Sequence, residues 1–110
     1  GFRALYLRAP RLFDDLASMD DRALQAVLAR ARSTDKEMLP LALRSCSEIM
    51  RTKLFAAMTS TIREEVEYTL EVMPPRRLSE IEEAQYLFVE IAKQLNEEGT
   101  IIFGGTEAVV

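Results

Sequence analysis

Histidine and tryptophan are both absent from this 110-residue chain, and Cys46 is its only cysteine. Without histidine, a Cys–His catalytic pair and every zinc site that needs an imidazole ligand are excluded. A lone cysteine cannot close an internal disulfide, so a reducing cytoplasm is the expected setting. Gly104-Gly105 lacks the following lysine and helix that a phosphate loop requires. We therefore predict that the chain is not an enzyme and that it carries no cofactor and no metal.

Long hydrophobic runs are missing as well. No apolar stretch approaches the roughly 20 residues that span a bilayer, and the first residues lack the pattern of a signal peptide. The chain opens at Gly1 without a methionine, so we interpret it as a fragment or as a recombinantly expressed segment. Hydrophobic residues make up 48% and charged residues 29%, the balance of one soluble globular domain. The net charge of −4 argues weakly against nucleic acid as a partner, because nucleic acids usually require a basic surface.

What the chain does contain is apolar residues at helical spacing in successive segments, separated by helix breakers. Pro10 and Pro74-Pro75 should end whatever precedes them, and Pro40 must either lie in the first turn of its helix or kink that helix. The expected helices span residues 11–18, about 21–31, a short segment that ends near residue 44, about 48–58, about 61–73 and 79–98. The sequence thus predicts an all-α fold, a single compact bundle of about six short helices.

Capping residues predict where these helices begin. Either Asp20 or Asp21 can cap the second helix, and Ser47 can cap the fourth. Ser33-Thr34-Asp35 is interpreted as a connection that supplies the next cap. Thr61 with Glu64 fits a capping box, with Thr59 as the alternative cap, and Ser79 with Glu82 fits another.

The last helix has the most regular pattern. Its apolar residues recur at alternating spacings of three and four, which predicts one long buried seam. That seam comprises Ile81, Ala84, Phe88, Ile91 and Leu95. Gly99 is the expected terminator. We assign residues 1–10 to a tail or linker from a preceding region and residues 11–110 to the helical domain, with a small hairpin expected over residues 101–110.

The fifth expected helix carries an acidic ridge. Glu64, Glu67, Tyr68 and Glu71 follow one another at spacings of three and four, and Arg63 lies beside them. Glu67 and Glu71 are like charges one turn apart, and Glu71 lies at the end of the helix where the dipole disfavours an acid. Two interpretations stay open. The ridge is either an ordinary solvated helix face or an interface for a basic partner.

Several runs of this sequence resemble a known family. They are Leu12-Phe13-Asp14-Asp15-Leu16, Asp20-Asp21-Arg22-Ala23-Leu24-Gln25, Leu41-Ala42-Leu43-Arg44, Lys53-Leu54-Phe55-Ala56-Ala57-Met58-Thr59, Arg77-Leu78-Ser79-Glu80-Ile81-Glu82-Glu83-Ala84-Gln85 and Ile91-Ala92-Lys93-Gln94-Leu95-Asn96-Glu97-Glu98-Gly99-Thr100-Ile101-Ile102. In this order, and without a gap over residues 12–103, they are similar to the C-terminal, torque-generating domain of the flagellar motor switch proteins of the FliG family.

The resemblance implies a fold, a location and partners. It implies an armadillo-like helical domain in the cytoplasmic ring of the rotor, at the cytoplasmic face of the inner membrane in the flagellar basal body. In that family the fifth helix carries charges that face the cytoplasmic loop of the stator protein MotA. Other surfaces contact the switch protein FliM and further copies in the ring. The implied role is in torque generation and switching, without nucleic acid.

Only some of the family's functional positions are matched by residues of this chain. Arg44 and Arg77 match basic positions of its pattern. The basic residue at the start of its torque helix aligns with Thr61, however, and its acidic pair aligns with Tyr68 and Thr69. Only Phe13 remains of its Met-Phe-x-Phe hinge.

From the ridge and the resemblance together we predict a protein interface. Its members are Arg44, Arg63, Glu64, Glu67, Glu71 and Arg77. The departures leave two alternatives open: a divergent structural paralogue without a stator contact, or a helical module similar to that of MgtE-type magnesium transporters.

Overall fold

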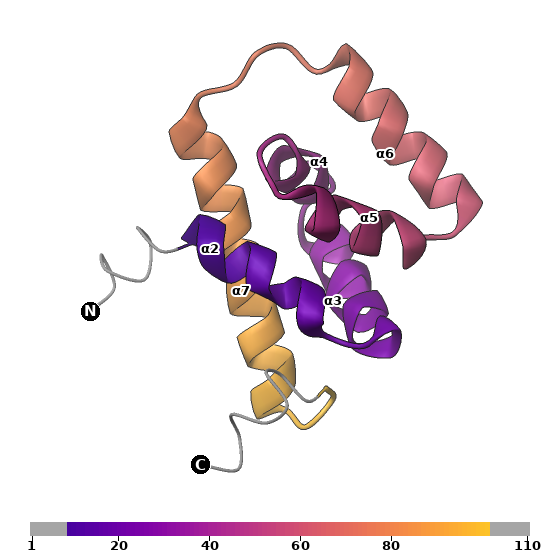
Figure 1. Ribbon diagram of the computed structural model, residues 1–110, viewed down its shortest axis with the longest axis vertical. Coiled ribbons are helices and arrows are strands. Elements are labelled where there is room, and N and C mark those ends of the chain that lie inside the picture. Colours follow the sequence, from indigo (N-terminus) through magenta and orange to yellow (C-terminus); the bar gives the residue numbers. More distant parts are fainter. Residues whose placement is uncertain (1–8, 102–110) are drawn as a thin grey trace.

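The computed structural model describes residues 9–101, and all regular structure in that part of the chain is helical (Figure 1). The helices are α2 (Ala9–Asp15), α3 (Asp21–Thr34), α4 (Met38–Leu43), α5 (Glu48–Ala56), α6 (Ser60–Val72) and α7 (Leu78–Glu97), with one 3-10 turn, η1 (Leu16–Ser18). The predicted all-α class with about six short helices is confirmed. The predicted hairpin lies almost entirely outside the described residues.

The core forms around α7, which packs against α4, α2 and α3. The predicted seam of α7 is buried along its whole length, because its apolar residues fall on the face that these three helices cover. Phe88 of this seam meets Phe13 of α2 edge to face, with ring centroids 5.3 Å apart and ring planes at 88°. Both rings are fully buried, so this pair fixes where α2 crosses α7.

One polar side chain lies inside the core. Gln85 of α7 is 1% exposed, and its Nε2 donates to the carbonyl oxygen of Ala42 at 3.0 Å and to that of Ser45. These carbonyls lie in the last turn of α4 and just after it, where helix carbonyls lack donors from their own helix. Gln85 therefore fixes the end of α4 to α7. Its Oε1 is buried and has no hydrogen-bond partner among residues 9–101.

Three helices begin at side-chain caps. Asp20 Oδ1 accepts from the amide of Ala23 at 2.7 Å, and Ser47 Oγ accepts from that of Met50 at 3.1 Å. Thr59 Oγ1 accepts from the amide of Ile62 at 3.2 Å. The caps at Asp20 and Ser47 are confirmed. The capping box at Thr61 is wrong, because Thr59 takes the role and places Thr61 in the first turn of α6.

Ser33 and Thr34 form the last turn of α3, so the predicted connection there is wrong. Their hydroxyls donate to the carbonyl of Arg30 at 2.9 and 2.8 Å, so both side chains bond back onto their own helix. The connection begins at Asp35, whose Oδ1 accepts from the amide of Glu37 at 2.9 Å.

Helix α7 begins earlier than predicted. Arg77 is its N-cap, and Glu80 Oε1 accepts from the amide of Arg77 at 3.0 Å. The predicted capping box of Ser79 and Glu82 is therefore wrong. Ser79 lies inside the first turn, because Glu80 is the acid that reaches back to the free amide at the helix start.

The other helix ends differ from prediction by a few residues or agree with it. Helix α2 begins at Ala9 rather than at residue 11, with Pro10 in its first turn, where the missing N–H costs nothing. Helix α5 ends at Ala56 rather than at Met58. Gly99 ends α7 as predicted: its φ is +81°, its amide donates to the carbonyl of Asn96 at 3.0 Å, and that of Thr100 donates to the carbonyl of Leu95 at 2.9 Å.

Candidate protein interface on α6

Helix α6 lies at the edge of the molecule, beyond α4 and α5, and extended residues 73–77 lead from it to α7 (Figure 1). Among residues 9–101 it packs most extensively on α4. Val66 is its one buried residue, and Ile62, Leu70 and Met73 are half-buried against the core. Ile62, Val66 and Leu70 share one stripe of the helix, and Met73 follows just past its end, so the remaining faces of α6 are open to solvent.

The predicted acidic residues lie on these open faces. Glu64, Glu67 and Glu71 are all exposed. Glu67 pairs with Arg63 one turn before it at 3.5 Å, and Glu65 pairs with Arg32 of α3 at 3.4 Å. Glu64 and Glu71 make no ion pair with any residue in the range 9–101. Two carboxylates of α6 therefore lack an ion-pair partner among the described residues.

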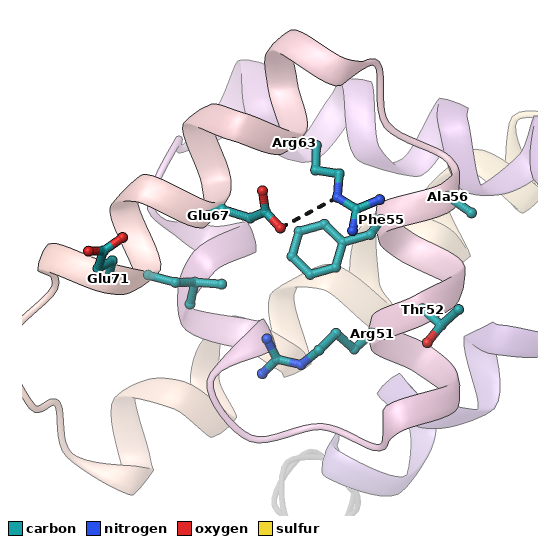
Figure 2. A pocket seen from close by; sticks show the side chains of 8 residues that line it. Arg51, Thr52, Phe55, Ala56, Arg63, Glu67 and Glu71 are labelled. Atoms are coloured by element: carbon teal, nitrogen blue, oxygen red, sulfur yellow. Dashed lines mark hydrogen bonds and ion pairs between the residues drawn. The ribbon is translucent and has the colours of Figure 1, made fainter.

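A groove of about 650 Å³ separates α6 from α5 (Figure 2). Its lining residues are Arg51, Thr52, Phe55, Ala56, Arg63, Glu67, Leu70 and Glu71. The guanidinium of Arg63 stands 5.1 Å from the centroid of the Phe55 ring, so it combines a cation–π contact with its pair to Glu67. Glu67 and Glu71 thus border the groove, whereas Glu64 is not part of its lining.

The two other predicted interface residues lie apart from the ridge. Arg44, half-buried at the end of α4, donates from Nη1 to the carbonyl of Leu70 at 3.3 Å and so supports the last turn of α6. Arg77 is exposed at the start of α7. The structure therefore brings Arg63, Glu67 and Glu71 together around one groove, sets Arg44 against the end of α6, and leaves Arg77 separate.

Sequence reasoning missed two residues of this surface, Arg51 and Phe55. Both lie on α5, and their meeting with α6 depends on the turn at residues 57–59. No spacing within either helix predicts this meeting. The only signal in the sequence is the aromatic ring of Phe55, which follows Arg51 and Thr52 at helical spacing.

Burial raises the pKa of the Cys46 thiol, which is half-buried and donates to the carbonyl of Leu43 at 3.7 Å. Its neutral form is therefore favoured, as in buried cysteines that are chemically inert. Within residues 9–101, no three carboxylate or cysteine side chains gather as a metal site would require. No helix in the same range has both the length and the apolar character needed to cross a bilayer.

The start of α7 depends on a charged contact. The guanidinium of Arg76 bonds the carboxylate of Glu80 at 3.0 Å, and this bond, together with the amide of Arg77, holds the pKa of Glu80 below its ordinary value. Arg76 also reaches Glu37 at 3.6 Å, which ties α7 to the residue before α4. The contact favours the ionised carboxylate in the folded state.

We expect the substitution Glu80→Gln to destabilise the domain at pH 7 and to change it little at pH 3. Because the folded-state pKa is lowered, the stabilisation is present above the ordinary glutamate pKa of about 4.3 and is lost as the pH falls through the lowered value. Urea unfolding of both proteins across this pH range measures the difference. Glu83→Gln, at an exposed position without an ion pair in residues 9–101, is the control. An equal loss of stability at both pH values would contradict the expectation.

Comparison with known proteins identifies a family whose sequences match this chain. Residues 11–103 match the family described as the FliG C-terminal domain. The chain is 39% identical over 94 residues to the flagellar motor switch protein FliG of Pseudomonas aeruginosa, which covers 86% of this chain and 27% of that protein. It is 36% identical over 101 residues to the flagellar motor switch protein FliG of Thermotoga maritima, which covers 90% of this chain and 29% of that protein.

A third relative is the flagellar motor switch protein FliG of Bacillus subtilis, 33% identical over 102 residues that make up 90% of this chain and 29% of that protein. The chain thus spans less than a third of the length of these relatives. The match nevertheless covers most of the described helical body, from α2 to the end of α7. The chain belongs to the FliG C-terminal domain family.

Proposed function

We propose that this chain is the rotor-side domain of a flagellar motor switch protein and that the charged surface of α6 meets a basic segment of the stator. Family membership supports the first part, because the curated relatives are flagellar motor switch proteins. The second part rests on one observation: α6 displays Glu64, Glu67 and Glu71 to solvent while the core holds only its opposite stripe. Such a surface is suited to contacts that form and break repeatedly, because exposed charges steer encounter more than they add affinity.

The proposal includes the setting of the domain. In this setting the domain lies in the rotor ring at the cytoplasmic face of the inner membrane. There it also contacts the switch protein FliM and neighbouring copies of itself, while the stator partner is MotA. The chain has a net charge of −4, and a negatively charged surface suits protein partners better than nucleic acid. The family match favours this function over that of a magnesium-transporter module.

One observation supports a second candidate, a structural paralogue that has lost the stator contact. Three positions that bear charge in the family's torque helix are uncharged here: Thr61, Tyr68 and Thr69. Thr69 moreover turns its hydroxyl to the carbonyl of Glu65 at 2.9 Å, inside its own helix. A domain with this surface would keep its place in the ring without taking part in torque.

Charge reversal separates the two candidates. We expect the combined change Glu64→Lys, Glu67→Lys and Glu71→Lys to leave the domain folded, because exposed ion pairs contribute at most about 1 kcal/mol. We expect it to weaken binding to the cytoplasmic part of the stator on the order of tenfold, and more at low salt. Circular dichroism, binding at two salt concentrations and swimming of cells that carry the full-length protein are the measurements.

The matched control reverses three exposed acids away from α6, by Asp15→Lys, Glu83→Lys and Glu97→Lys. We expect this variant to swim normally and to bind the stator with unchanged affinity. If the α6 variant also keeps normal swimming and binding while filaments still form, the stator contact is refuted and the structural paralogue is favoured. If cells that lack the gene assemble and rotate filaments normally, the proposed function itself is wrong.

A further inference from the structure

Helix α6 buries far fewer residues against the domain than the other two long helices do. Of its 13 residues only Val66 is buried, whereas eight of the 20 residues of α7 and five of the 14 residues of α3 are buried. It packs mainly on the short α4, and the groove of about 650 Å³ lies between it and α5 (Figure 2). Because burial of an apolar face provides most of the stability of a helix in a protein, α6 is the most weakly attached of the three.

One carbonyl near the end of α6 lacks the donor that a continuing helix would supply. The carbonyl of Leu70 would accept from the amide of residue 74, but Pro74 has no N–H. The amide of Met73 donates instead to the carbonyl of Thr69 at 2.9 Å. Arg44, at the end of α4, supplies the missing donor, because its Nη1 bonds the carbonyl oxygen of Leu70 at 3.3 Å. Its positive charge also lies at the negative end of the α6 dipole, which strengthens the contact.

Two further side-chain contacts between α6 and its neighbours lie at the surface. Arg32 of α3 pairs with Glu65 at 3.4 Å, and Arg63 stands 5.1 Å from the centroid of the Phe55 ring of α5. The side chains of Glu65 and Arg63 are each about half exposed, so solvent weakens both contacts. Arg44 is half-buried and serves an acceptor that its own helix leaves without a donor. Its bond to α6 is therefore the strongest of these three contacts.

We infer that α6 opens from the domain as one unit while the body formed by α2, α3, α4, α5 and α7 stays folded, and that the Arg44 bond sets how often it opens. A helix of 13 residues is marginally stable on its own, so α6 loses its helical hydrogen bonds once it leaves α4. The turn at residues 57–59 and the extended residues 73–77 are where the chain bends in this opening. Arg44 thereby has a role inside the domain, which does not depend on what the surface of α6 binds.

Native-state hydrogen exchange of the 110-residue chain, followed by NMR at several low urea concentrations, tests the separate opening. The amides of residues 64–71 should share one exchange free energy with little dependence on urea, because opening exposes only α6. They should exchange on the order of 100-fold faster than the buried amides of α7. Ile91→Val, a change in the buried seam of α7, should speed exchange in α7 about fivefold and leave that in α6 unchanged. The reason is that the packing of Ile91 is the same whether α6 is open or closed.

Two arginine variants test the role of the Arg44 bond. Arg44→Met keeps the aliphatic stem but loses the donor to Leu70. It should speed exchange in α6 and α7 by the same factor, about tenfold, because the bond is absent from both the open and the unfolded state. Arg32→Met is the matched control. It removes only the exposed pair with Glu65 and should change exchange about twofold or less.

Each part of the inference has its own contrary result. If α6 exchanges with the free energy and urea dependence of α7, only global unfolding exposes it and the separate opening is refuted. Protection that falls steadily from the middle of α6 to its ends would show fraying and would refute it too, as would equal acceleration of both helices by Ile91→Val. That variant keeps the separate opening testable even if Arg44→Met fails to fold. Exchange in Arg44→Met that equals that of the unchanged protein, or of Arg32→Met, overturns the role of Arg44.

Discussion

Replacing Phe88 by alanine is expected to lower the free energy of unfolding by about 3–5 kcal/mol. The ring is fully buried at the centre of α7 and meets Phe13 edge to face, so its loss removes transfer free energy, leaves a cavity and ends an aromatic contact. A domain of this size has only about 5–15 kcal/mol of stability in total, so the variant should unfold at markedly lower urea concentration. Equilibrium unfolding followed by circular dichroism measures the change.

The neighbouring residue provides the control for this prediction. Leu87 is 43% exposed on the same helix, and Leu87→Ala should cost well under half as much. Similar losses for both variants would show that the helix, and not the core contact, is what the substitution at Phe88 disturbs. Phe13→Ala should repeat most of the loss, because it removes the other ring of the pair, and the double variant should lose less than the sum.

Gln85→Leu is expected to lower the free energy of unfolding by about 2 kcal/mol. The substitution fills the site with an apolar side chain but removes the donor that serves the carbonyls of Ala42 and Ser45. Each buried acceptor left without a donor costs about 1–3 kcal/mol. The leucine also removes Oε1, which is buried without a partner within residues 9–101, so part of the loss is offset. Unfolding in urea gives the net value.

A second measurement locates the effect of this change. Amide exchange should rise most at the end of α4 and around Ser47, whose amide donates to Asp14 at 3.1 Å and depends on the same stretch of chain. Gln85→Met fills the site with a side chain of similar length and also lacks the donor, so it should lose about as much as the leucine variant. Stability above that of the unchanged protein in either variant would show that the unsatisfied oxygen costs more than the two bonds contribute.

The buried face of the last helix and two of the helix starts were predictable from the sequence, because they depend on spacing within single helices. The seam from Ile81 to Leu95 and the caps at Asp20 and Ser47 follow from local periodicity and hydrogen bonding alone. The predicted helix starts were wrong where two nearby residues could each act as the N-cap. Thr59 and Thr61 could each cap α6, and the serine at residue 79 has a higher capping preference than Arg77. Tertiary placement and the reach of Glu80 decided these cases.

The candidate interface was predictable in part for the same reason. The exposure of Glu64, Glu67 and Glu71 follows from the apolar stripe on the opposite side of α6. The groove beside it was not predictable, since Phe55 and Arg63 belong to different helices and meet only in the folded chain. Nor does spacing indicate that Arg44 donates to the carbonyl of Leu70, 26 positions away along the chain.

The attachment of α6 has a mechanical consequence. This helix rests mainly on α4, which in turn is fastened to α7 by close packing and by Gln85 (Figure 1). A force on the exposed side of α6 is therefore transmitted mainly through its packing on the short α4 before it reaches the long α7. The extended residues 73–77 form a second connection between α6 and α7, and Arg76 within them is held by Glu37 and Glu80. In this architecture α4, the shortest of the α-helices between residues 9 and 101, is the element that transmits a force from α6 to the rest of the domain.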